Sequence, residues 1–166
     1  MRKIHAMMLI PGAMMAGAAH TATTTTNFAV TSTLLATCAA TANTLAFGTY
    51  TPGAGALTAN GTVTVKCTKN SPYTVALNGG STAGGTVAQR LMASGANTLQ
   101  YNLFTSAAFT TVFGDGSGTS KTESGTGGGM TTGTAFTVFG QLPDNAANQL
   151  AVPGSYTDTV TVTVTY

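Results

Sequence analysis

The C-terminal stretch Tyr156-Thr157-Asp158-Thr159-Val160-Thr161-Val162-Thr163-Val164-Thr165-Tyr166 carries the clearest structural pattern in the chain. Threonine occupies nearly every second position, and apolar residues fill most of the others. Because successive side chains of a β-strand point to opposite faces, this alternation predicts a strand with one apolar face. Asp158 falls on the apolar face near the start of the strand. We expect a structural hydrogen-bonding role for it rather than a catalytic one.

A second alternating segment lies near the N-terminus, after four consecutive threonines at residues 23–26. One face of this predicted strand carries Phe28, Val30, Ser32, Leu34, Ala36 and Cys38, while Leu35 places an apolar side chain on the polar face. The segment could pair within its own domain as the first strand of a sandwich. It could equally add to the open sheet edge of another chain, and the pattern alone leaves both alternatives open.

Short strands separated by turns are predicted between these two segments. Turn signals such as Pro52-Gly53 and Asn60-Gly61 separate the predicted strands at residues 44–50, 61–68, 73–77, 99–105, 109–113 and 134–141. This spacing is typical of an immunoglobulin-like β-sandwich. The glycine-rich stretch 114–133 is predicted to be a long mobile loop, and no helical periodicity is found after the first 22 residues.

The composition also indicates an all-β protein of one domain. The chain has 166 residues, of which only 6% are charged, and its polarity comes largely from 35 threonines and 21 glycines. Threonine suits a pleated strand, and glycine suits a turn. This length accommodates one sandwich domain and is short for two.

The first 22 residues have the pattern of a secretory signal peptide. Arg2 and Lys3 precede a mostly apolar run at residues 4–15, and small residues follow at 16–19, so we expect cleavage near residues 18–22. The apolar run is shorter than a membrane span requires, and we expect no lipid anchor. After cleavage, four basic and four acidic residues remain, and this balance argues against nucleic acid as a partner.

No catalytic constellation is expected in the exported chain. Its two histidines, His5 and His20, both lie in the predicted signal peptide, which excludes the usual Ser-His and Cys-His pairs. We expect no enzyme activity, no cofactor and no metal, although calcium at Asp115 and neighbouring carbonyls is a minor alternative. Cys38 and Cys67 are predicted to form a disulfide, as is usual for two cysteines in an exported chain.

Several motifs resemble the spore coat U (SCPU) domain family, in order, over nearly all of residues 27–166. The motifs are the alternating segment before Cys38, Leu45-Ala46-Phe47-Gly48-Thr49-Tyr50, Val63-Thr64-Val65-Lys66-Cys67-Thr68, Leu99-Gln100-Tyr101-Asn102-Leu103-Phe104, Val112-Phe113-Gly114-Asp115-Gly116, Val138-Phe139-Gly140-Gln141-Leu142-Pro143 and Pro153-Gly154-Ser155-Tyr156-Thr157-Asp158 with the strand that follows. Two positions depart from the family pattern. Phe113 stands where the family often has Trp, and Ser32 stands where a larger apolar residue is expected.

This resemblance implies an incomplete immunoglobulin-like β-sandwich that is completed by a donor strand. The family includes subunits of archaic (Csu-type) chaperone–usher pili, so the expected partners are a periplasmic chaperone, an outer-membrane usher and neighbouring pilin subunits. The resemblance implies a donor-strand extension at residues 23–37, with Phe28, Val30 and Leu34 inserting into a neighbour, and a sandwich domain at residues 38–166. Val160, Val162 and Val164 are expected to line part of the acceptor groove.

The implied function is that of a structural subunit of a secreted fimbria that supports adhesion and biofilm formation. The chain would pass through the periplasm to the cell surface. Two alternatives stay open: a self-complemented spore-coat or matrix protein that does not polymerise by strand exchange, and a sugar- or surface-binding adhesin. A tip adhesin of this family would usually add a second domain, so a shaft or adaptor subunit is expected.

Overall fold

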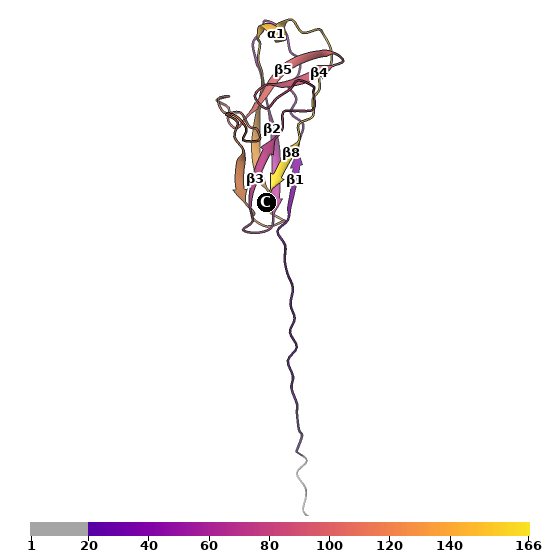
Figure 1. The fold of residues 1–166 in the computed structure, drawn as a ribbon, viewed down its shortest axis with the longest axis vertical. Coiled ribbons are helices and arrows are strands. Elements are labelled where there is room, and N and C mark those ends of the chain that lie inside the picture. The colour runs from indigo at the N-terminus through magenta and orange to yellow at the C-terminus, as the bar shows by residue number, and fades with distance from the viewer. Residues whose placement is uncertain (1–19) are drawn as a thin grey trace, which may run out of the picture. The chain divides into compact units, whose positions relative to one another are not determined.

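The computed structural model describes residues 20–166, which divide after Thr33 into two units. The predicted signal peptide lies outside the described residues except for residues 20–22, which have no regular structure. Residues 20–37 are exposed and form neither helix nor strand (Figure 1). The strand predicted from Phe28 onward is therefore not formed in the single chain. An alternating segment becomes a strand only where another strand supplies its backbone hydrogen bonds, and residues 20–37 are in no strand pair.

The second unit, Leu34–Tyr166, is a β-sandwich of two antiparallel sheets. The five-stranded sheet has the order β1-β2-β7-β5-β4, and the three-stranded sheet has the order β6-β3-β8. The elements are β1 (Cys38–Ala42), β2 (Leu57–Cys67), β3 (Pro72–Leu77), β4 (Arg90–Ser94), β5 (Asn97–Phe104), β6 (Glu123–Thr126), β7 (Thr134–Leu142), α1 (Ala146–Gln149) and β8 (Val162–Thr165). The all-β sandwich expected from the sequence is confirmed.

The core of the sandwich consists of the apolar residues that alternate along facing strands. Strands β2, β3 and β5 supply most of these buried side chains, which are Val63, Val65, Cys67, Tyr73, Val75, Leu77, Leu99, Tyr101 and Leu103. Phe113 is completely buried and joins this cluster, so a phenylalanine fills the position where a tryptophan was expected. Alternation places these residues on the inner face because every second side chain of a strand points the same way.

The predicted strands agree with the structure in the middle of the chain and differ from it elsewhere. Residues 44–50 are irregular, and residues 109–113 make only the isolated bridges of Val112 and Phe113. The long C-terminal strand is regular only in β8, although Thr157 forms an isolated bridge with Ala93. Strand β4 and the short helix α1 were not predicted. Both are short, with five and four residues, so their periodic signal is weak.

The glycine-rich stretch 114–133 contains ordered structure rather than a uniform mobile loop. Strand β6 lies within it and pairs with β3. A side chain at Gly125 would collide with the ring of Tyr73, and one at Gly127 would collide with the backbone of Thr68. The N–H of Gly127 donates to Ser71 O at 2.8 Å. These two glycines therefore allow segments to pack closely.

Candidate functional site

An open groove of about 1140 Å³ runs along one side of the sandwich. Its two walls are the irregular residues 43–50, which follow β1, and residues 151–160, which lead into β8. Buried side chains of both sheets form its floor, namely Val63, Leu77, Leu99, Leu103, Val138 and Leu142. Because residues 43–56 form no strand, the wall that follows β1 does not pair with β8. The groove therefore gives access to the apolar interior of the sandwich.

The wall that leads into β8, together with the start of β8, presents an unpaired backbone edge to this groove. The N–H of Asn78, which follows β3, donates to Thr161 O at 3.1 Å, and Thr157 exchanges two hydrogen bonds with Ala93 of β4 in the other sheet, so the backbone groups of these odd-numbered residues are paired within the sandwich. Backbone direction alternates along a strand, and the N–H and C=O groups of Val160 and Val162 therefore point to the opposite edge. Strand β8 is the last strand of its sheet. Such an edge is a template for one more strand.

The residues expected at this site lie in two different environments. Val160 and Val162 line the groove and are half-buried, whereas Val164 is half-buried against the core and is not among the lining residues. In the N-terminal segment, the exposed fractions of Phe28, Val30 and Leu34 are 86%, 82% and 87%. The roles of these residues as donor and acceptor remain predictions.

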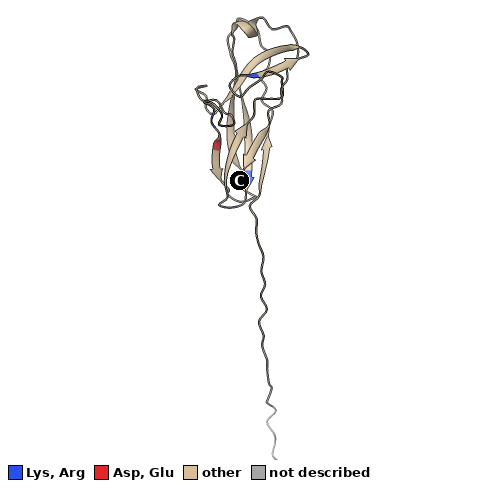
Figure 2. Cartoon of the chain, in the orientation of Figure 1, with Lys and Arg blue, Asp and Glu red and all other residues tan. Residues whose placement is uncertain are grey.

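Asp158 is the one charged residue among the described residues that line the groove (Figure 2 marks the charged positions). Its Oδ1 accepts hydrogen bonds from the backbone N–H groups of Ser81 and Thr82 at 2.9 and 3.0 Å, and from both of their hydroxyl groups at 3.1 Å. Its Oδ2 accepts from the hydroxyl of Tyr101 at 2.6 Å. Gly80, with φ +90°, allows the loop to pass this close, because a Cβ there would overlap the carboxylate.

These contacts set the protonation states at the groove. Burial alone would raise the pKa of Asp158, but the hydrogen bonds from Tyr101 and Ser81 outweigh it and hold the pKa below the usual 3.8. Burial raises the pKa of Tyr101, and its hydrogen bond to Asp158 adds to that effect. At neutral pH, Asp158 is therefore an ionised acceptor, and Tyr101 is a neutral donor.

Arg90 stabilises the same region through hydrogen bonds, and it was not predicted from the sequence to do so. It is completely buried, and its guanidinium donates to four acceptors: Asn78 O at 2.9 Å, Asn102 Oδ1 at 2.7 Å, Phe113 O at 2.9 Å and Leu77 O at 3.4 Å. Burial lowers the pKa of Arg90, and the negative charge of Asp158 partly opposes this. The sequence does contain one indication of this role, because Arg90 is a single arginine next to apolar residues in a chain with few charges.

Asp144 holds the end of the first groove wall. The hydroxyl of Tyr50 donates to its Oδ1 at 2.6 Å, and the N–H groups of Gly53 and Gly55 donate to its carboxylate at 3.1 and 2.8 Å. The bond from Tyr50, followed by those from the two glycines, lowers the pKa of Asp144 to about 2. The sequence indicated only a turn here, because the partners of Asp144 are about 90 residues away along the chain.

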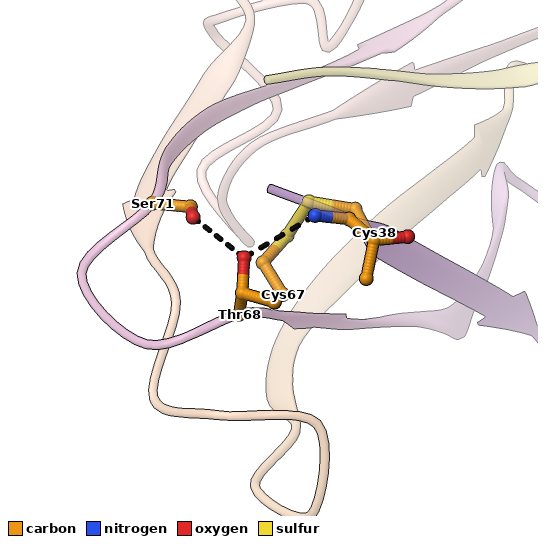
Figure 3. Close-up of a disulfide and its surroundings, with 5 residues drawn as sticks. Cys38, Cys67, Thr68 and Ser71 are labelled. Atoms are coloured by element: carbon orange, nitrogen blue, oxygen red, sulfur yellow. Dashed lines mark hydrogen bonds between the residues drawn. A yellow bond between two sulfur atoms is a disulfide. The ribbon is translucent and has the colours of Figure 1, made fainter. Parts of the chain in front are cut away.

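A disulfide joins Cys38 to Cys67, as predicted, where β1 begins (Figure 3). The two cysteines stand directly opposite each other in the β1–β2 ladder. Beside them, the N–H of Thr37 donates to the hydroxyl oxygen of Thr68 at 3.2 Å, and that oxygen lies 2.7 Å from the hydroxyl oxygen of Ser71. The disulfide thus fixes the point where the exposed segment 20–37 joins the sandwich.

Residues 20–166 contain no cluster of three or more His, Cys, Asp or Glu side chains that could hold a metal ion. Over the same residues, no helix has the length and apolar character needed to cross a membrane.

Comparison with known proteins gives a family match and a structural match. The model of the Spore Coat Protein U domain family matches residues 24–163. No curated protein matches the chain. One similar solved structure is the CsuC–CsuE chaperone–tip adhesion subunit pre-assembly complex from archaic chaperone-usher Csu pili of Acinetobacter baumannii. The match to one chain of that complex has 25% identity and a TM-score of 0.57, and it covers 81% of this chain and 41% of that one.

Proposed function

Because this chain belongs to the Spore Coat Protein U domain family, we propose that it is a structural subunit of a surface fibre assembled by donor-strand exchange. The observation that carries this proposal is the apolar groove beside the unpaired edge of β8 and of the residues that lead into it. Residues 28–34 have the matching properties, since they alternate in polarity and their apolar side chains are exposed. Inserted into the groove of a second copy, this segment would bury those side chains and pair its backbone with the open edge.

The expected assembly partners follow from the exposed interior of the groove. An apolar interior left open to water invites aggregation, so a subunit awaiting assembly needs a temporary occupant. We propose that a periplasmic chaperone fills the groove first and that an outer-membrane usher exchanges it for the segment 23–37 of the next subunit. The similar solved structure is a complex of a chaperone with a subunit, and this supports the chaperone step.

In this proposal the mature protein begins near residues 18–22 and reaches the cell surface through the periplasm. Residues 38–166 are the sandwich domain, and residues 23–37 serve as the donor. The fibre would support adhesion and biofilm formation. A structural role of this kind uses no catalytic residues, and we assign the chain no enzymatic activity.

Chain geometry argues against self-complementation in the antiparallel direction. Ala42 ends β1 and Val162 begins β8, so we take these two lining residues as the near end of the groove, and Pro52 and Val152, each ten residues away along the chain, as its far end. Antiparallel to residues 156–162, the donor segment would leave the groove at the far end. Residues 42–50, which run along one wall, would span about 25 Å if extended, and this gives the approximate length of the groove. The linker available to the donor segment is residues 35–37, which span only about 10 Å. These three residues are too short to return from the far end to Cys38 of the same chain, and a second copy has no such constraint.

The proposal is tested by deleting residues 23–36 and co-expressing the chaperone. We expect the full chain to form polymers, which are detected by electron microscopy and by gel ladders without heating. The truncated chain should keep its groove, remain bound to chaperone and form no polymer. Deletion of residues 23–26 alone is the matched control, since it removes only threonines, and it should leave polymerisation intact. A truncated chain that folds as a stable free monomer would contradict strand exchange.

A further inference from the structure

Each of the two segments paired in the proposed exchange has one polar residue on an otherwise apolar face. Between Phe28 and Leu34, the exception is Ser32. Between Tyr156 and Val162, the exception is Asp158, which lines the groove together with Val160 and Val162. A buried polar group is costly without a partner, so an apolar side chain placed against the Asp158 carboxylate would be a poor match.

One antiparallel register brings these two exceptions together. If Ser32 of the incoming copy stands opposite Asp158, then Val30 faces Val160 and Phe28 faces Val162. Leu34 then faces Tyr156, which is half-buried at the far end of the groove. Each of the three large apolar side chains on the donor face, Phe28, Val30 and Leu34, meets an apolar residue in this register. Each paired strand of the sandwich is antiparallel to its neighbours, and the added strand continues that arrangement.

Other registers fit less well. A slip by one residue turns the threonines toward the core. A slip by two places either Val30 or Leu34 against Asp158 and leaves the Ser32 hydroxyl against Val160 or Tyr156. A parallel segment with Ser32 at Asp158 would place Phe28 opposite Gly154, which is exposed and outside the core. The polar match therefore distinguishes one arrangement from its neighbours.

One oxygen of the Asp158 carboxylate has hydrogen-bonding capacity left, although the backbone of Gly80 packs against that same oxygen. Oδ1 is surrounded by four donors from Ser81 and Thr82, whereas Oδ2 accepts a single bond, from Tyr101. An ionised carboxylate oxygen can accept two hydrogen bonds, and bonds to an ionised acceptor are the stronger kind. A hydroxyl is also short enough to lie in the groove without displacing Tyr101.

We propose that Ser32 of the incoming copy donates a hydrogen bond to Asp158 of the receiving copy, and that this pair sets the register of the exchanged strand. The inference rests on the proposed function. It assigns Ser32 and Asp158 a role in specificity, because a donor segment with a large apolar residue at this position would leave the carboxylate facing a hydrocarbon surface.

Engineered disulfides between copies test the register. The chain carrying Val30→Cys and Val160→Cys should form polymers whose subunits stay linked in a ladder on a non-reducing gel, because residues directly opposite have Cβ atoms about 5 Å apart. Two matched chains report a slip by two residues: Phe28→Cys with Val160→Cys, and Val30→Cys with Val162→Cys. These should give little linkage, because diagonal neighbours lie about 7–8 Å apart.

The outcomes separate the two proposals. Polymers that lack the Val30–Val160 linkage, or that link through either slipped pair instead, overturn the register and leave strand exchange standing. If the unmodified chain forms no polymer with its chaperone and usher present, the proposed function fails, and the register fails with it.

A hydroxyl substitution series tests the hydrogen bond itself. Ser32→Ala polymers should dissociate about tenfold faster on heating in detergent, since the bond to an ionised acceptor is lost. Ser32→Thr keeps the hydroxyl and should dissociate at nearly the unmodified rate. Thr31→Ala removes a hydroxyl from the opposite face and should change little. Equal dissociation rates for Ser32→Ala and the unmodified chain would overturn the pairing. Since Ser32 is exposed in the single chain, these substitutions leave the folding of the sandwich intact.

Discussion

Residues 28–34 and residues 156–164 share one sequence pattern but differ in environment. Both alternate apolar residues with polar ones, largely threonine. Val160 and Val162 pack against the core, whereas Phe28 and Val30 are more than four-fifths exposed. Alternation therefore specifies an amphipathic strand without specifying where its apolar face is buried.

The contacts around Asp158 explain the difference. Residues 156–161 are largely outside regular sheet, yet the Asp158 carboxylate ties them to Ser81, Thr82 and Tyr101, and Thr157 bonds to Ala93. Residues 28–34 have no comparable anchor among the hydrogen bonds of the described chain. One segment is held by its own domain, and the other is available to a second copy in the proposed exchange.

The largest effect is expected at the disulfide, which joins the first residue of β1 to the last residue of β2. Cys38→Ser should lower the free energy of unfolding by about 3–4 kcal/mol, because closure of a loop with a sequence separation of 29 restricts the unfolded chain. Urea unfolding without reductant measures the change. Reduction of the unmodified protein should reproduce it. An unchanged unfolding midpoint would mean that the disulfide contributes nothing to the attachment of β1.

A smaller effect is expected at the anchor of the C-terminal segment. Asp158→Asn should cost about 2 kcal/mol at pH 7, because an ionised acceptor of several hydrogen bonds is lost. The pKa of Asp158 is lowered in the folded state, so its stabilising contribution is complete above pH 3.8 and is lost as the pH falls through the folded pKa. The difference in free energy of unfolding between Asp158→Asn and the unmodified protein should therefore become smaller below pH 3.8. Urea unfolding at several pH values measures this difference. A constant difference would rule out ionisation as its source.

The smallest effects come from one substitution made in both regions. Val160→Ala should destabilise the sandwich by about 1 kcal/mol, because the side chain is half-buried. Val30→Ala should change subunit stability by less than about 0.5 kcal/mol, since Val30 is 82% exposed, while it weakens polymers. Thermal unfolding of the subunit and dissociation of polymers measure the two responses. Equal destabilisation of the subunit by both substitutions would abolish the distinction between the two regions.

Sequence patterns predicted the central strands because their alternation is local. Strands β3, β5 and β7 lie close to their predicted bounds, and the disulfide followed from export and cysteine number. Strand β2 begins at Leu57 and runs through Asn60-Gly61, so the turn predicted there is wrong, because both residues pair with β7. The failures have physical causes. Residues 44–50 alternate like a strand, yet they form one wall of the groove and pair with no other strand. Strand β6 was not predicted because it contains a glycine, Gly125, which is typical of a turn. The ring of Tyr73, which is distant in sequence, leaves no space for a side chain at this position.

The candidate site was only partly predictable for the same reason. Val160 and Val162 were expected at the groove from the family resemblance, and both line it. Arg90, Tyr50 and Asp144 were not recognised as supports of this region. Their hydrogen-bond partners come from other strands and loops, and the local periodicity of the sequence does not indicate such long-range contacts.

The position of the disulfide also determines how the domain carries mechanical load. A pull on the N-terminal segment reaches the sandwich at Cys38, the first residue of β1, where the disulfide passes it directly to β2 next to the centre of the five-stranded sheet. Residues 39–66, which include one wall of the groove, are thereby bypassed. Under reducing conditions the same pull could draw out on the order of 100 Å of chain. The oxidised domain is a tether of fixed length, and the reduced one is extensible.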